Sequence, residues 1–79
     1  MDLEKIKNVH IIGIGGIGIS AIAKMMLKLG KKVSGSDINS SEIIKDLKNR
    51  GVKIYPKHKK ENLSSDVDLV IYSFAVKAK

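Results

Sequence analysis

The 79-residue sequence has no cysteine, no tryptophan and a single proline. The lack of cysteine excludes disulfide bonds and thiolate metal sites, and it fits a reducing compartment. No apolar run approaches the roughly 18 residues that a membrane-spanning helix needs. The first five residues carry acidic side chains and lack the basic-then-apolar order of a secretory signal peptide. We therefore expect a cytoplasmic protein with no membrane partner.

Aromatic rings are also scarce, although basic residues are abundant. Lysine and arginine number 15 against 8 acidic residues, so the formal charge is +7. This excess raises the question of a nucleic-acid partner. However, the lysines are scattered over every segment, Arg50 is the only arginine, and few rings are available to stack on bases. We expect no nucleic-acid partner, and a module that binds polyanions is the weakest alternative. A basic surface still attracts phosphorylated small molecules.

The apolar pattern alternates between strands and helices. It predicts strands over residues 9–12, 33–36, 52–55 and 69–73, helices over 17–29 and 41–50, and a short helical turn within 57–63. This order is typical of an open parallel sheet of the Rossmann-like α/β class, with strand order 3-2-1-4 and helices on both faces. Seventy-nine residues make at most one small domain. On the first helix, the spacing predicts a polar stripe and an opposite buried side made of Ile19, Ile22, Ala23, Met26 and Leu29; the stripe is Ser20, Lys24 and Lys28.

A glycine-rich turn joins the first strand to the first helix. Gly13, Gly15 and Gly18 match the pattern G-x-G-x-x-G. We expect Gly13 to permit the tight turn, Gly15 to let the backbone approach a diphosphate, and Gly18 to let the helix pack close to the sheet. The N–H groups and positive dipole at the helix start would hold the anion. The predicted binding residues in the loop are Gly13, Ile14, Gly15, Gly16, Ile17 and Gly18.

Other candidate residues follow the strands or the loop. Asp37 ends the second strand, where an acid accepts hydrogen bonds from ribose hydroxyls, although it could belong only to the turn that follows. Ser20 either adds a hydroxyl to the site or faces solvent. Ser73, Phe74 and Ala75 follow the fourth strand at the same sheet edge. His10 interrupts the first strand, and we interpret it as a packed side chain outside the site.

The sequence has no G-x-x-x-x-G-K-[ST] motif, so it has no P-loop for ATP chemistry. No carboxylate pair, nucleophile–base pair or metal-ligand cluster stands out either. These residues therefore predict a module that binds a nucleotide diphosphate, with no catalytic residue, metal ligand or cofactor of its own.

Residues 9–20, VHIIGIGGIGIS, resemble the N-terminal signature of the Mur ligases, in particular of those that add L-alanine to UDP-N-acetylmuramate. The similarity continues through KVSGSD, GVKI, a GHxxxN-like stretch with His58 and Asn62, and YSFAV at residues 72–76. Pro56-Lys57 stands where the family often has a glycine before the histidine, and Phe74 replaces a serine.

The resemblance implies that residues 1–79 are the partial, truncated first domain alone of a three-domain enzyme of peptidoglycan synthesis. In that family, the first domain binds the UDP part of the substrate, a central domain binds ATP and magnesium, and a C-terminal domain helps to bind the amino acid. ATP phosphorylates the muramyl carboxylate, which L-alanine then attacks. The remaining domains would be its partners, and Ser36 and His58 are further candidate site residues. The alternative is an NAD(P)-binding Rossmann module of a dehydrogenase or a ligand-sensing regulatory domain, since both classes share the glycine motif and Asp37.

Overall fold

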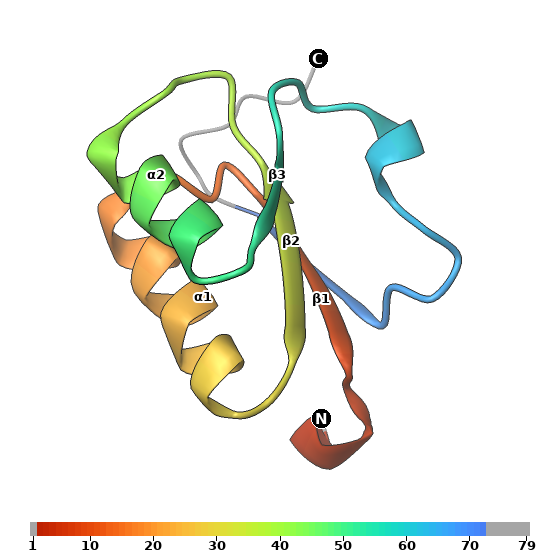
Figure 1. Cartoon of the computed structure of the whole chain (residues 1–79). Coiled ribbons are helices and arrows are strands. Elements are labelled where there is room, and N and C mark those ends of the chain that lie inside the picture. The colour runs from red at the N-terminus through yellow and green to blue at the C-terminus, as the bar shows by residue number, and fades with distance from the viewer. Residues whose placement is uncertain (1, 73–79) are drawn as a thin grey trace.

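The structure, a computed structural model, describes residues 2–72 as a four-stranded parallel sheet with helices packed against it (Figure 1). The strand order is β3-β2-β1-β4, as predicted. The strands are β1 (Asn8–Ile12), β2 (Lys32–Ser36), β3 (Lys53–Tyr55) and β4 (Leu69–Tyr72). The helices are α1 (Ile17–Lys28), α2 (Glu42–Asn49) and the 3-10 turns η1 (Leu3–Lys5) and η2 (Lys60–Asn62). Within residues 2–72, no helix has both the length and the apolar character needed to cross a membrane.

Strand β1 lies between β2 and β4 and sets the register of both. Val9 pairs with Val33 on β2 and with Leu69 on β4. Just before β4, the Asp68 carboxylate accepts the N–H groups of Asn8 at 2.9 Å and Lys7 at 2.8 Å. These bonds favour the charged carboxylate, so they hold the pKa of Asp68 below its ordinary value. The carboxylate thereby fixes the start of β4 against the start of β1.

Both α-helices lie on one face of the sheet, and the short turn η2 lies on the other face, so helical segments flank both faces as predicted (Figure 1). The chain runs from β1 to β2 and on to β3 in one direction across the sheet. Right-handed crossovers in one direction deliver their helices to the same side. The crossover from β3 back to β4 passes over the other face, and in it the chain forms only the single turn η2.

The core lies between the sheet and the two helices. Its buried side chains come from alternate positions of the strands, from the glycine turn and from one side of each helix: Val9, Ile11, Ile14, Ala23, Met26, Val33, Ile44, Leu47 and Val52. The buried side chains of α2 are Ile44 and Leu47.

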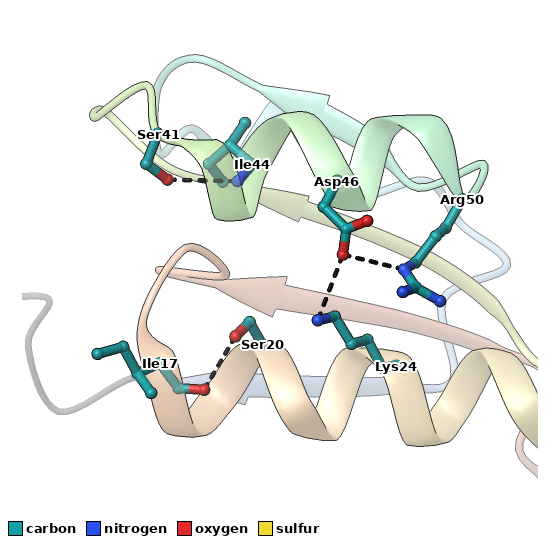
Figure 2. A network of polar contacts seen from close by, with 7 residues as sticks. All are labelled: Ile17, Ser20, Lys24, Ser41, Ile44, Asp46 and Arg50. Carbon is teal, nitrogen blue, oxygen red and sulfur yellow. Dashed lines mark hydrogen bonds and ion pairs between the residues drawn. The ribbon is translucent and has the colours of Figure 1, made fainter.

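The predicted orientation of α1 is partly wrong. Ile22 and Leu29 are 36% and 53% exposed, whereas Ser20 is buried. The first helix is apolar around most of its circumference, so the spacing of its lysines does not determine which residues meet the sheet. The Ser20 hydroxyl is accommodated because it donates to the carbonyl of Ile17 at 2.9 Å (Figure 2).

A small polar network joins the outer sides of the two helices (Figure 2). The Asp46 carboxylate on α2 contacts the Arg50 guanidinium at 3.0 Å and the Lys24 ammonium of α1 at 3.3 Å. Hydrogen bonds from Arg50 and Lys24 lower the pKa of Asp46 from its ordinary value. All three side chains are partly exposed, so the network adds little to stability and serves mainly to align the helices. Ser41 caps α2 by accepting the N–H of Ile44 at 3.3 Å.

The face of the sheet opposite the helices, which we call the polar face, carries hydrogen-bonded polar side chains on β1 and β2, and Val70 and Tyr72 of β4 also lie on it. His10 on β1 is 1% exposed and its Nδ1 lies 2.8 Å from the hydroxyl of Ser34 on β2. The ring of Tyr55 on β3 lies tilted against the His10 ring, with centroids 6.1 Å apart. Two residues further along β2, the Ser36 hydroxyl lies 2.6 Å from Nδ1 of His58 in the crossover to β4. The interpretation of His10 as a packed side chain is confirmed.

We expect the stability of the chain to fall on acidification because of His10. Burial lowers the pKa of His10 from 6.5, and the nearby His58 charge lowers it further. Below about pH 6.5, the unfolded chain therefore binds a proton that the folded chain resists, and the free energy of unfolding decreases. Urea denaturation at pH 7.5 and 5.5 measures the loss. His10→Asn, which keeps a polar atom near the Nδ1 position, is expected to lose less, and an equal loss in both proteins would contradict this account.

Two glycine substitutions are expected to change stability in opposite directions. A Cβ on Gly35 would lie 2.7 Å from both the Ile11 carbonyl oxygen and Cδ1 of Ile14, so Gly35→Ala should destabilise the chain by about 1–3 kcal/mol. A Cβ on Gly18 would meet no atom of the described residues within 4 Å. Gly18→Ala should therefore stabilise the chain by up to about 1 kcal/mol through helix propensity. Urea unfolding midpoints test both, and a Gly35→Ala midpoint at or above that of Gly18→Ala would refute the packing argument.

Candidate functional site

The glycine loop turns sharply at the end of β1 and is held by the end of β2. Gly13 has φ +80°, a conformation that favours glycine, which confirms its predicted role in the tight turn. The carbonyl of Ser36 accepts the N–H groups of Gly13 at 2.8 Å and Ile14 at 3.2 Å. The Ile14 side chain is fully buried in the core, so only its backbone remains near the loop surface. The start of the loop is therefore rigidly tied to the neighbouring strand.

The Asp37 side chain also bonds the glycine loop to the end of β2. Its Oδ2 accepts the N–H of Gly15 at 2.8 Å, and its Oδ1 accepts the N–H of Asn39 at 2.9 Å. A Cβ on Gly15 would lie 2.8 Å from Oδ2 of Asp37 and 3.1 Å from Cδ1 of Ile44. In the ligand-free chain, the close approach that requires glycine at position 15 is thus made by this carboxylate. Asp37 belongs to the turn and also contacts the loop.

The start of α1 leaves backbone donors available beyond this point. Gly16 is the N-cap and has no side chain to satisfy them, and its own N–H bonds to the Gly13 carbonyl at 3.2 Å. The first backbone N–H of the helix to find a recorded partner in residues 2–72 is that of Ser20, which donates to Gly16. The three preceding N–H groups, of residues 17–19, have no partner among residues 2–72 and form the positive end of the helix.

An exposed side chain lies next to these donors. The Ile17 side chain is 84% exposed and points away from the core (Figure 2). A Cβ added to Gly18 would meet no atom of residues 2–72 within 4 Å. The prediction that Gly18 permits close packing of the helix on the sheet is therefore not supported. Three N–H groups at the exposed start of a helix form a cradle for an anion, which we call the α1 cradle.

The remaining predicted residues differ in their burial and in their hydrogen-bond partners. The Ser20 hydroxyl is buried, so the alternative that it faces solvent is wrong. The Ser36 hydroxyl is fully buried on the polar face and bonds to His58. This pair therefore packs against the end of β2 on the face of the sheet opposite the helices. Ser73, Phe74 and Ala75 lie outside the described residues.

Two contributors to the site were not predicted. The Ser36 carbonyl holds the loop, and the Tyr55 carbonyl accepts the N–H of Asp37 at 3.0 Å. Since every residue has a carbonyl, no side-chain pattern marks these positions. Ile44 on α2 closes the space beside Gly15, and its regular helical spacing predicts only that it is buried.

The groups at the glycine loop are suited to binding an anion. Among residues 2–72, no three His, Asp or Glu side chains lie together as metal ligands. The functional groups at the loop are backbone N–H donors and one carboxylate. Such groups are suited to hold a phosphate and a neighbouring hydroxyl.

Comparison with known proteins identifies the family. Residues 8–79 match the family model described as "Mur ligase family, catalytic domain". This chain belongs to the Mur ligase family. The resemblance seen in the sequence is thereby confirmed, and it covers the glycine loop, Asp37 and the stretch after β4 in a single match.

Individual Mur ligases align along nearly the whole chain. The UDP-N-acetylmuramate–L-alanine ligase of Acetivibrio thermocellus is 53% identical over 78 residues, which is 99% of this chain. The enzyme of the same name from Aquifex aeolicus is 55% identical over 74 residues, or 94% of this chain. In both cases this chain spans 16% of the relative's length.

A solved structure supports the fold. The precorrin-2 dehydrogenase SirC superposes with a TM-score of 0.72, and the match covers 92% of this chain and 37% of SirC. The sequence identity is 21%, so the likeness concerns the Rossmann-like architecture alone.

Proposed function

We propose that this chain binds the UDP part of UDP-N-acetylmuramate as the substrate-binding region of a UDP-N-acetylmuramate–L-alanine ligase. The observation that carries the proposal is its 53% identity, across 99% of its length, to a relative of that name. The match covers nearly the whole of this chain, which includes its own glycine loop and Asp37. Cytoplasmic location is part of this proposal.

The α1 cradle supplies the diphosphate site in this proposal. The N–H groups of residues 17–19 and the positive end of α1 would bind the phosphate oxygens. The exposed Ile17 side chain places the start of α1 at the surface of the described part of the molecule. The formal charge of +7 favours the approach of an anionic ligand from solution.

The nucleoside would extend from the cradle toward the end of β2. Asp37 is half-buried, and each of its carboxylate oxygens has one recorded hydrogen bond, so each retains a lone pair for a ribose hydroxyl. Ser36 and His58 would stabilise this edge without contacting the ligand. Ser73, Phe74 and Ala75 would contribute backbone groups from the adjacent strand end.

The ligation itself would be carried out elsewhere in a whole enzyme. This chain has no P-loop sequence, so ATP and magnesium would bind to other parts of the ligase. There, phosphoryl transfer from ATP would activate the muramyl carboxylate, and the amine of L-alanine would displace the phosphate. The remaining domains of the ligase are therefore the proposed protein partners of this chain.

A ligand titration tests the proposal. UDP-N-acetylmuramate, UDP and NAD are added separately to the ¹⁵N-labelled chain at millimolar concentrations, and amide chemical shifts are followed. The two uridine ligands should shift the amides of residues 13–20, and NAD should shift them less. If NAD shifts these amides and the uridine ligands do not, the proposal is wrong and the dinucleotide alternative replaces it.

Gly15→Val is expected to abolish the shifts caused by UDP. Gly15 is not among the glycines with positive φ, so valine is compatible with its backbone and the chain should still fold. The added side chain would collide with the Asp37 carboxylate and Ile44 and would obstruct the loop. Amide dispersion of the free variant provides the control for folding. Unchanged UDP binding in the folded variant would show that the ligand does not approach the loop at this point.

A further inference from the structure

We propose that a cavity on the polar face, beside the amino ends of β1 and β2, binds the phosphate monoester of a small polyhydroxylated molecule. Asn8 and Lys32, the first residues of these strands, line the cavity, whereas the glycine loop follows the last residue of β1. Neither the glycine loop nor Asp37 lines it. The inference therefore does not rest on the proposed function.

The cavity has a volume of about 460 Å³ and lies between the sheet and the segment that returns from β3 to β4. Ser64, Asp66 and Val67 of the returning segment form one wall. The Asn8 side-chain amide donates to the Asp66 carbonyl at 3.0 Å, and the Asn8 carbonyl accepts the N–H of Asp68 at 2.9 Å. These bonds fix the wall relative to the sheet, and the volume is in the range of small-molecule sites.

Two lysines give the opposite wall its charge. Lys32 begins β2, Lys53 begins β3, and both line the cavity. Lys53 pairs with Ser34, which comes two residues after Lys32, so the three side chains lie on one face of the sheet. The Lys53 ammonium lies 5.3 Å from the centre of the Tyr55 ring, a contact that holds it beside the cavity. Neither lysine has an ion-pair partner among residues 2–72, so two positive charges are available to an anion.

A phosphate monoester matches this charge. It carries close to two negative charges near neutral pH because its second pKa is about 6, and each ammonium group has three N–H donors for its oxygens. Ser34 adds a hydroxyl group that lines the cavity, and its Oγ lies 2.8 Å from Nδ1 of the buried His10. Since a hydroxyl both donates and accepts, Ser34 can bond to His10 and to a ligand at the same time.

The wall formed by the returning segment is suited to hydroxyl groups. The Ser64 hydroxyl donates to Oδ1 of Asp66. Oδ2 of Asp66 and Oδ1 of Asn8 have no recorded partner among residues 2–72, so both can accept hydrogen bonds from a ligand. The Asp66 carboxylate repels phosphate and accepts hydroxyl donors. A ligand therefore binds with its phosphate toward the lysines and its hydroxyl groups toward Asp66.

Titration of the ¹⁵N-labelled 79-residue chain with glucose 6-phosphate at pH 7.5 tests the proposal. The amides of Ser34, Lys53 and Val67 should shift. Inorganic phosphate should bind there at least about fivefold more weakly because it lacks the hydroxyl groups, and glucose should bind more weakly still because it lacks the charge. Shifts confined to residues 13–20, or equal affinities for glucose 6-phosphate and inorganic phosphate, would refute the proposed site or its ligand class.

Charge substitutions locate the phosphate. Lys32→Met and Lys53→Met each remove one charge and keep an apolar stem, so each should weaken glucose 6-phosphate binding by about fivefold, whereas Lys53→Arg should retain it. Lys48→Met is the matched control, because Lys48 is an exposed lysine of α2 on the other face of the sheet. It should change the affinity by less than about twofold. Equal losses in all three methionine variants would show an effect of net charge alone and overturn the site, as would unchanged binding in the Lys32 and Lys53 variants.

Discussion

The end of strand β2 is the point on which the rest of the site depends. In two consecutive residues, the Ser36 carbonyl and the Asp37 carboxylate together accept the N–H groups of Gly13, Ile14 and Gly15. The loop is thereby held in one conformation before any ligand arrives. Pre-organisation of this kind reduces the entropy that binding would otherwise lose, and it determines which backbone donors remain available for a phosphate.

The two faces of the sheet contribute differently to the structure: one holds the apolar core, and the other contacts the strand end that holds the glycine loop. The helix face carries the apolar core, and its packing against α1 and α2 provides most of the driving force for folding. The other face carries hydrogen-bonded pairs, His10 with Ser34 and Ser36 with His58. Residues 2–72 contain no buried side-chain polar atom without a hydrogen-bond partner, so this polar face is compatible with a folded chain. Its His58 contact reaches the residue whose carbonyl holds the loop.

The fold was largely predictable from the sequence, because β-branched runs, glycine punctuation and the handedness of crossovers leave few alternatives. The placement of both helices on one face follows from the same handedness rule once the strand order is known. The rotation of α1 was not predictable, since Ile22, Leu29 and Ser20 all lie on an apolar helix with no clear polar side. At the site, the position of Asp37 was predictable from its spacing. The hydrogen bond from the Gly15 N–H to Asp37 was not predictable, because it depends on how two separate segments pack together.

The pairing of β4 with β1 has a consequence for how the site forms. Contacts between β1 and β2 join residues 24 apart, such as His10 and Ser34, whereas the contact of Asn8 with Asp68 spans 60 residues. Closing the longer loop costs about 0.8 kcal/mol more in chain entropy and delays this pairing relative to the local ones. The glycine loop and its attachment to β2 therefore assemble in an early folding unit. We expect the strand that completes the sheet edge beside them to join later and to open earlier in amide exchange.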